Sequence, residues 1–237
     1  MTRRFGCELE FSSFKTEVIE ILEKKLKSRL RRLEPVTYKK WQVKNDNSTS
    51  GEVVTPICTK RSISQIMMVC NLLKSNGIKI TENDGFHVHV SIKQKEIDNI
   101  LALWVACEED IFKAFPRCRR SNTYCKKLTR KSNLPPILSL PSCVERSGDH
   151  HSVISTYRDD INTIEFRIAE GTLDAQFVRA WINFCLSFVD FSSRMNPLCL
   201  LEKPYCLTLS KVASMIKLNR RDTKILMNRR RMYGKLK

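Results

Sequence analysis

Residues 5–11, with the sequence Phe-Gly-Cys-Glu-Leu-Glu-Phe, alternate apolar and acidic side chains. Successive side chains of a β-strand point to opposite faces, so Glu8 and Glu10 leave the same face, opposite Cys7. Their carboxylates then lie roughly 7 Å apart at the backbone, and like charges held this close are unfavourable unless cations compensate them. Mg²⁺ and Mn²⁺ prefer carboxylate oxygen and would do so. Taken alone, a solvated strand face explains the pair more simply.

Two further segments repeat this alternation. His87 and His89 alternate with valines, and Glu165 and Arg167 alternate with isoleucine and phenylalanine. An imidazole can bind a metal or, when protonated, a phosphate, and a guanidinium matches the geometry of phosphate oxygens. Exposed histidines or a simple ion pair explain each segment by itself. Three strands that each present paired polar groups on one face indicate a shared site for metal and phosphate.

The remaining pattern predicts an α+β fold with a mainly antiparallel sheet. Helical spacing predicts helices over residues 14–33, 64–76, 94–115 and 174–191. Alternation and turn residues predict strands over residues 4–11, 38–44, 52–57, 78–80, 86–92 and 163–169. Strands that return to pair after single helices favour antiparallel order. Residues 117–150 are polar, basic and proline-bearing, which predicts a long loop or mobile flap.

The charge balance favours an anionic partner. Forty-two basic residues against 25 acidic ones give a formal charge of +17, much of it in residues 24–32, 117–131 and 217–237. Nucleotide, nucleic acid and acidic polypeptides all fit such a field. No P-loop or Rossmann glycine motif occurs, so nucleotide binding would have to use metals and arginines on a sheet.

Other features exclude several classes of protein. No apolar run reaches the ~18 residues that cross a bilayer, and two acids occupy the position where a signal peptide needs an apolar stretch. The ten scattered cysteines include no Cys-x-x-Cys pair, which predicts reduced, structural thiols. Cys118 and Cys125 lack a second ligand pair for zinc. We expect an intracellular, cytoplasmic protein without a membrane partner.

Five short motifs follow one another along about residues 5–190. They are residues 5–11; Trp41-Gln-Val-Lys-Asn-Asp46-Asn-Ser48 with Gly51-Glu52-Val-Val-Thr-Pro56; Gly85-Phe-His87-Val-His89-Val-Ser91; Arg119-Arg120-Ser-Asn122-Thr-Tyr124-Cys125; and Tyr157-Arg158 with Asn162 and residues 163–173. Together they resemble the signature of the amidoligase family, a branch of the glutamine synthetase and glutamate–cysteine ligase superfamily. Residues after about 195 match no part of that signature, so we expect a catalytic domain over 1–195 and a basic C-terminal extension over 196–237.

The resemblance implies a glutamine-synthetase-like fold, in which a curved, mainly antiparallel sheet carries helices on one face. It also implies an ATP-dependent carboxylate–amine ligase that acts through an acyl-phosphate and uses Mg²⁺ or Mn²⁺. The implied metal ligands are Glu8, Glu10, Glu52, His87 and Glu165. The implied nucleotide contacts are His89, Ser91 and Arg119, with Arg158 and Arg167 on phosphate or acyl-phosphate. Glu52 or Asp46 is a candidate general base.

Substrate identity does not follow from a family resemblance. The carboxylate and the amine could belong to small molecules or to peptides. Two alternatives from other classes stay open: a nucleic-acid-binding protein on a degenerate ligase fold, and a metal-dependent hydrolase or nuclease. A ligase that modifies substrates associated with nucleic acid would combine the first alternative with the resemblance.

Overall fold

The structure is a computed structural model that describes residues 3–13, 15–26, 30–31, 40–44, 50–81, 83–128, 145, 151–156, 162–200 and 207–235. Its strands are β1 (Phe5–Phe11), β2 (Leu30–Arg31), β3 (Trp41–Lys44), β4 (Gly51–Val54), β5 (Phe86–Ser91), β6 (Ile154–Ser155) and β7 (Thr163–Phe166). They form one sheet in the order β2-β3-β4-β1-β5-β7-β6. The β2–β3 pair is parallel and every other pair is antiparallel.

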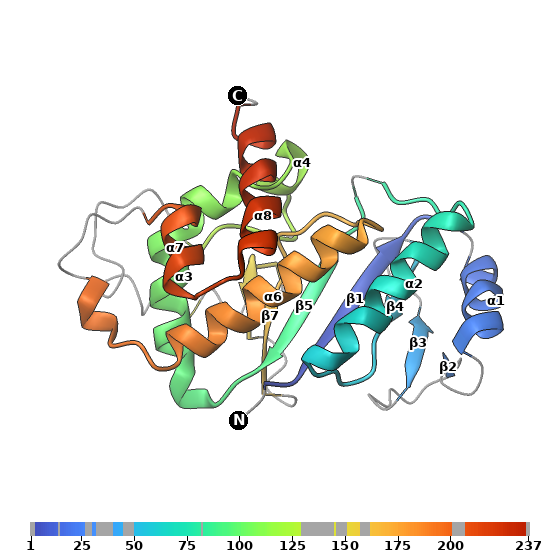
Figure 1. Ribbon diagram of the computed structural model, residues 1–237, viewed down its shortest axis with the longest axis horizontal. Helices are drawn as coiled ribbons and strands as arrows, with labels where there is room; N and C mark the ends of the chain where they lie inside the picture. The colour runs from blue at the N-terminus through green and yellow to red at the C-terminus, as the bar shows by residue number, and fades with distance from the viewer. Residues whose placement is uncertain are drawn as a thin grey trace.

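The α-helices are α1 (Lys15–Leu26), α2 (Ile63–Ser75), α3 (Ile97–Phe112), α4 (Arg117–Arg120), α6 (Ala175–Ser192), α7 (Leu209–Met215) and α8 (Arg220–Tyr233). Short 3₁₀ turns occupy Lys60–Ser62, Gln94–Glu96 and Pro197–Leu200. Helices α2 and α6 cross one face of the sheet, and α8 packs along the outside of α6 (Figure 1). The α+β class with a mainly antiparallel sheet is therefore confirmed. Across the described residues, the structure contains no helix with the length and apolar character needed to span a membrane.

The apolar side chains of the central strands lie under α2 and α6. Leu9, Val88 and Phe166 are fully or almost fully buried. The Phe166 ring lies edge-on to Trp104, with centroids 5.7 Å apart, and to Trp181 at 6.4 Å, an arrangement that aromatic quadrupoles favour. Because this face of the strands is sealed against helices, the polar residues that alternate with these apolar ones must lie on the opposite face.

One predicted helix ends earlier than expected, and one predicted strand is absent. A single helix was expected over residues 14–33, but α1 ends at Leu26, and Leu30 pairs with Trp41 in the parallel β2–β3 bridge. Pairing with a neighbouring strand overrides the local helical spacing there. Residues 78–80 form no strand; instead Ser12 N–H donates to Lys79 O at 3.0 Å, and Lys79 N–H donates to Ser13 Oγ at 2.8 Å. Of the predicted loop over 117–150, the described part begins with α4.

The segment 207–235 folds into α7 and α8, although the basic stretch from Lys217 onward shows little apolar periodicity in the sequence. Leu226 is buried and Ile225 and Met227 pack against the core, and polar contacts hold α8 as well. Arg230 forms a bidentate pair with Asp110 of α3, at 2.6 and 2.7 Å, and Asp110 also accepts the Leu209 N–H at 2.8 Å. Charged residues therefore occupy inward positions that hydrophobic periodicity would assign to solvent.

Candidate active site

The central strands β1, β5 and β7 are neighbours in the sheet and bring the paired polar residues together. Glu8 lies directly opposite His87, and His89 lies directly opposite Glu165. All four side chains leave the face away from α2 and α6, yet each residue is at most 8% exposed. The shared polar face predicted from the alternation is therefore present, and it is buried rather than solvated.

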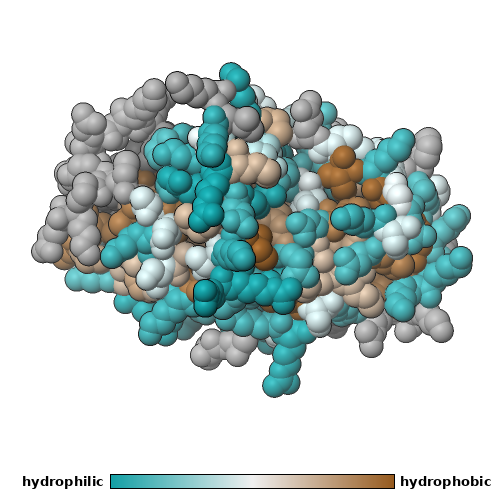
Figure 2. Space-filling view, turned by 45° about the horizontal axis from the view of Figure 1, so that its top comes forward, coloured by the Kyte–Doolittle hydropathy of each residue, from teal (hydrophilic) through white to brown (hydrophobic). Residues whose placement is uncertain are grey.

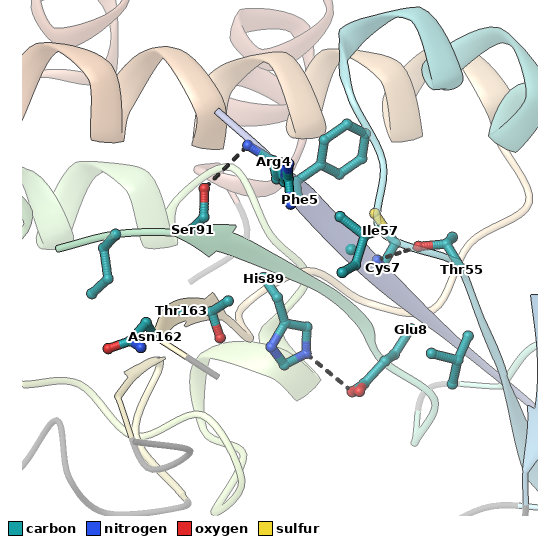
Figure 3. A pocket seen from close by; sticks show the side chains of 13 residues that line it. Arg4, Phe5, Cys7, Glu8, Thr55, Ile57, His89, Ser91, Asn162 and Thr163 are labelled. Atoms are coloured by element: carbon teal, nitrogen blue, oxygen red, sulfur yellow. Dashed lines mark hydrogen bonds and ion pairs between the residues drawn. The ribbon is translucent and has the colours of Figure 1, made fainter. Parts of the chain in front are cut away.

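The four side chains touch one another through their charged atoms. His87 Nδ1 lies 3.2 Å from Glu165 Oε1 and 3.5 Å from Glu8 Oε2, and His87 Nε2 lies 3.5 Å from Glu10 Oε1. His89 Nε2 lies 3.3 Å from Glu8 Oε2 and 3.7 Å from Glu165 Oε1. Figure 3 shows Glu8 and His89 facing each other from β1 and β5.

These contacts shift the pKa values in opposite directions. Burial raises the pKa of Glu8, but the positive charge of His89 and the contact with His87 outweigh it and hold that pKa well below its usual range. Burial likewise raises the pKa of Glu165, yet His89, His87 and Arg167 bring it to about 2. Burial and Arg167 lower the pKa of His87, whereas Glu165 and Glu8 raise it more, to about 9. In the described structure, protonated imidazoles therefore neutralise the ionised carboxylates.

One group of donor atoms is suited to a metal ion. A carboxylate oxygen of Glu8, a ring nitrogen of His89 and a carboxylate oxygen of Glu165 lie within 4.8 Å of one another. Among the described residues it is the one such group of three or more. His89 Nε2 faces the carboxylates of both Glu8 and Glu165, so that the same nitrogen and oxygens can share a cation once the imidazole has lost its proton. The oxygen and imidazole donors suit Mg²⁺, Mn²⁺ or Zn²⁺.

A second acidic pair lies on the neighbouring strands. Glu10 is directly opposite Glu52 of β4, and Lys44 Nζ lies 3.7 Å from Glu52 Oε1. The backbone N–H of Gly85 donates to Glu10 Oε2. The described sheet therefore carries two adjoining acidic groups, one on each side of His87.

Gly85 permits this close approach, and its substitution should disturb the site. A Cβ built on Gly85 would lie 2.5 Å from His87 Nε2 and 3.2 Å from Glu10 Oε2. We expect Gly85→Ala to displace His87 and to lower activity roughly tenfold or more, while the melting temperature changes little. Gly77→Ala is unsuitable as a control because its φ is +74°. The control is Ser210→Ala, at an exposed position of α7 outside the site. Equal activity of the two variants would contradict this role for Gly85.

Two of the predicted arginines, Arg119 and Arg167, are linked to each other and to the acidic cluster by hydrogen bonds. Arg167 Nη1 lies 2.6 Å from Glu165 Oε1, and its Nε donates to Tyr124 O at 3.2 Å. Arg119 is 2% exposed and donates through Nη2 to Arg167 O at 2.6 Å. Arg119 thus braces the backbone that carries Arg167, and Arg167 orients the carboxylate of Glu165.

The sequence that carries this site matches a known family. A family model described as "Putative amidoligase enzyme" matches residues 1–189, which is most of the 237 residues. The chain belongs to the amidoligase family. The resemblance of its ordered motifs is thereby confirmed, and the match ends within α6. No curated protein matches the chain.

A cavity of ≈ 330 Å³ opens beside the acidic cluster of this amidoligase family member. Glu8 and His89 line its inner end, and the residues around it come from β1, β4, β5 and the start of β7 (Figure 3). Its walls include Phe5, Val54, Ile57 and Ile92, and its polar lining includes Arg4, Thr55, Ser91, Asn162 and Thr163. The motifs contain Phe5, Val54, Thr55, Ser91, Asn162 and Thr163, of which only Ser91 had an implied role. Arg4, Ile57 and Ile92 carried no sequence signal.

Two predicted site residues, Arg158 and Asp46, lie outside the described residues. The contacts of the amidoligase site with Lys44 and Gly85 were not predicted as functional. Lys44 is visible in the sequence only as one lysine among many. Its position beside Glu52 depends on the register of β3 against β4.

Proposed function

We propose that this amidoligase family member is an ATP-dependent carboxylate–amine ligase that acts through an acyl-phosphate. The observation that carries the proposal is the buried cluster of Glu8, His87, His89 and Glu165, of which Glu8 and His89 line the cavity. We infer further that the antiparallel sheet with helices on one face is glutamine-synthetase-like. The family membership and the strand order support that inference.

The donor atoms fit a divalent cation. Glu8, His89 and Glu165 would hold it, and Glu10 with Glu52 would offer a second acidic position across His87. A bound divalent cation would neutralise the triphosphate and act as a Lewis acid. Assigning His89 to the metal differs from the assignment implied by the motifs, which gave His87 to the metal and His89 to the nucleotide. The grouping of His89 with Glu8 and Glu165 within 4.8 Å supports the change.

The cavity fits the nucleotide. Its apolar walls would exclude water from a purine base, and Ser91, Thr163 and Asn162 could orient the base or the ribose. A nucleotide placed there would extend its phosphates toward Glu8 and His89 at the inner end. We assign Ser91 to the nucleotide on this ground.

The reaction needs an activated carboxylate because a free carboxylate would have to expel oxide. Transfer of the γ-phosphoryl group of ATP to the carboxylate oxygen makes an acyl-phosphate, and the amine then displaces phosphate. Such transfer depends mainly on positioning and on neutralising charge. Arg167, held between Glu165 and Tyr124 O, would stabilise charge on the transferred group. Glu52 would accept the proton that the amine loses.

Amine-dependent release of ADP tests this function. Wild-type protein is incubated with ATP and Mg²⁺ against pools of carboxylates and amines, and ADP is measured with each pool omitted in turn. We expect ADP release to require both pools. Hydrolysis of a phosphodiester without ATP would instead identify a metal-dependent hydrolase, and ADP release that needs neither pool would identify a simple ATPase.

Metal binding should depend on pH because the cation must replace protons. His87 keeps its proton up to about pH 9, and a cation bound beside it would drive that proton off. We expect Mn²⁺ affinity to rise by up to about tenfold per pH unit between about pH 7 and 9 and then level off. Calorimetry in two buffers of different ionisation enthalpy measures both affinity and proton release. An affinity that is flat across this range would contradict the assignment.

The same pKa shift predicts how stability depends on pH. The folded protein binds the His87 proton more tightly than the unfolded chain does, with a pKa of about 9 against 6.5. This stabilisation is complete below about pH 6.5 and is lost as the pH rises toward 9. The metal-free protein should therefore melt at a lower temperature at pH 9, and Mn²⁺ should restore it.

A further inference from the structure

The segment 207–235 plays no part in the proposed reaction, and it has an architecture of its own. Four residues, 216–219, separate α7 from α8. Helix α7 ends in a Schellman motif, in which Leu218 N–H donates to Ala213 O at 2.9 Å and Lys217 N–H donates to Ser214 O at 3.1 Å. Lys217 has a φ of +52°, at the position where glycine is usual.

Helix α8 then begins at a side-chain cap. Asn219 Oδ1 accepts the N–H of Asp222 at 3.0 Å, which is the standard N-cap bond. Two helices joined by a short, hydrogen-bonded turn make a helix-turn-helix unit. The turn and the cap hold α8 at a defined angle to α7.

The inner face of α8 is bound to the rest of the protein. Asp222 is fully buried and accepts from Arg179 Nε at 2.9 Å and from Asn183 Nδ2 at 2.8 Å. The Arg229 guanidinium lies 3.9 Å from the centroid of the Phe177 ring and pairs with Glu170. Contacts of this kind fix the rotation of α8 about its axis and therefore fix which residues face outward.

The outer face of α8 is a basic stripe. Arg220, Lys224, Asn228 and Arg231 are exposed at spacings of four, four and three, and Lys235 is exposed just beyond the end of the helix. Met232 is exposed beside them. Arg221 is also exposed and donates to the neutral amide of Gln176, so its charge is not cancelled. Residues 207–235 contain nine basic residues against one acidic residue, the buried Asp222. The stripe is about 21 Å long, since α8 has 14 residues.

Further cations lie near the end of this stripe. Arg120 Nη2 of α4 donates to Tyr233 O at 3.3 Å, which places α4 beside the last turn of α8. Lys113 and Arg117 are exposed in the same region of the chain. In Figure 2, where the end of the molecule that carries the C-terminus is turned forward, hydrophilic side chains predominate, with hydrophobic patches among them.

We propose that α7 and α8 form a site for double-stranded DNA, with α8 in the major groove. The groove is about 12 Å wide and admits one α-helix, and helix-turn-helix units place their second helix there. The cations of the stripe would contact phosphates and release counterions. Asn228, in the middle of the stripe, would reach base edges.

The same features disfavour other nucleic acids. Single strands bind through exposed aromatic rings, but the one aromatic residue of 207–235 is Tyr233, whose ring lies 5.0 Å from the Arg229 guanidinium. Double-stranded RNA has a major groove too narrow for side chains to read. The partner that fits both the shape and the charge is duplex DNA.

Fluorescence anisotropy tests the site with the full-length protein and a labelled mixed-sequence duplex about two helical turns long. The test variant carries Arg220→Gln, Lys224→Gln and Arg231→Gln. The control carries Lys24→Gln, Lys25→Gln and Lys74→Gln on α1 and α2. These three lysines are also exposed, and their substitution removes the same amount of charge. We expect the test variant to bind at least roughly tenfold more weakly and its salt slope to fall by about 3, one per cation. The control should bind within about twofold of wild type.

Three results would overturn the proposal: no binding by wild type, equal loss in both triple variants, or tighter binding of the single strand or of duplex RNA than of duplex DNA. The melting temperature and ADP release of the test variant should match those of wild type, because the three positions are exposed and remote from the acidic cluster. If the triple variant is less stable, the single substitution Lys224→Glu repeats the comparison against Lys74→Glu. A failure of the ligase assay leaves this test unaffected, since DNA binding does not depend on the reaction.

Discussion

Glu8→Gln should lower metal-dependent ADP release roughly 10³-fold while the protein stays folded. Glu8 contacts both histidines of the cluster, and its carboxylate belongs to the one group of donor atoms in the described structure that is suited to a metal. Glutamine keeps the volume and one oxygen but loses the charge that binds the cation. ADP release and Mn²⁺ affinity, measured on the same preparation, should fall together.

The control for this substitution is Glu109→Gln. Glu109 lies on the exposed side of α3, where its carboxylate pairs with Lys127 at 2.7 Å. The substitution removes the same charge from a surface ion pair, so stability should change by less than about 1 kcal/mol and activity should stay the same. Full ligase activity in folded Glu8→Gln protein would refute the site assignment, whatever happens to DNA binding.

Asp222→Ala should destabilise the protein by about 3–5 kcal/mol, the usual cost of removing one partner from a buried ion pair. Asp222 is fully buried, with 0% of its surface exposed. Its carboxylate accepts hydrogen bonds from the side chains of Arg179, Asn183 and Asn219. Alanine would leave the Arg179 charge without its partner at the interface of α6 and α8. The melting temperature should fall by roughly 10 °C in a chain of this size.

Asp98→Ala provides the comparison for Asp222→Ala. Asp98 is exposed in the first turn of α3, where it gains a favourable interaction with the helix dipole. Its loss should cost less than about 1 kcal/mol. Comparable melting temperatures for the two variants would show that the polar contacts do not hold α8 in place. A large loss confined to Asp222→Ala would support α8 as a fixed part of the fold.

The two predictions test the acidic cluster and the docking of α8 independently. Glu8 lies on the sheet face away from the helices, whereas Asp222 lies between α6 and α8 on the other side of the core. A variant at one position should leave the readout of the other intact. The family match ends at residue 189, so α7 and α8 follow the matched region, and their function has to be inferred from their own contacts.

The strands that carry the site, and the face on which their polar residues lie, can be read from the amino-acid pattern. A period of two is a local property of an extended chain, so the alternations at Glu8, His87 and Glu165 were sufficient to predict it. The ordered motifs also identified the family, as the family match confirms.

Which of these residues meet depends on contacts between distant parts of the chain. The order β1-β5-β7 and the register that sets His89 opposite Glu165 arise from long-range pairing, which local spacing does not encode. Because this pairing places His89 beside Glu165, we propose it as a metal ligand, whereas the motifs implied a contact with the nucleotide. The docking of α8 likewise depends on Arg230 meeting Asp110 and on Arg179 meeting Asp222, partners 120 and 43 residues apart. A charged residue can face inward only when an oppositely charged partner lies beside it. Such partners are distant in sequence and come together only in the folded protein, so the sequence pattern does not reveal them.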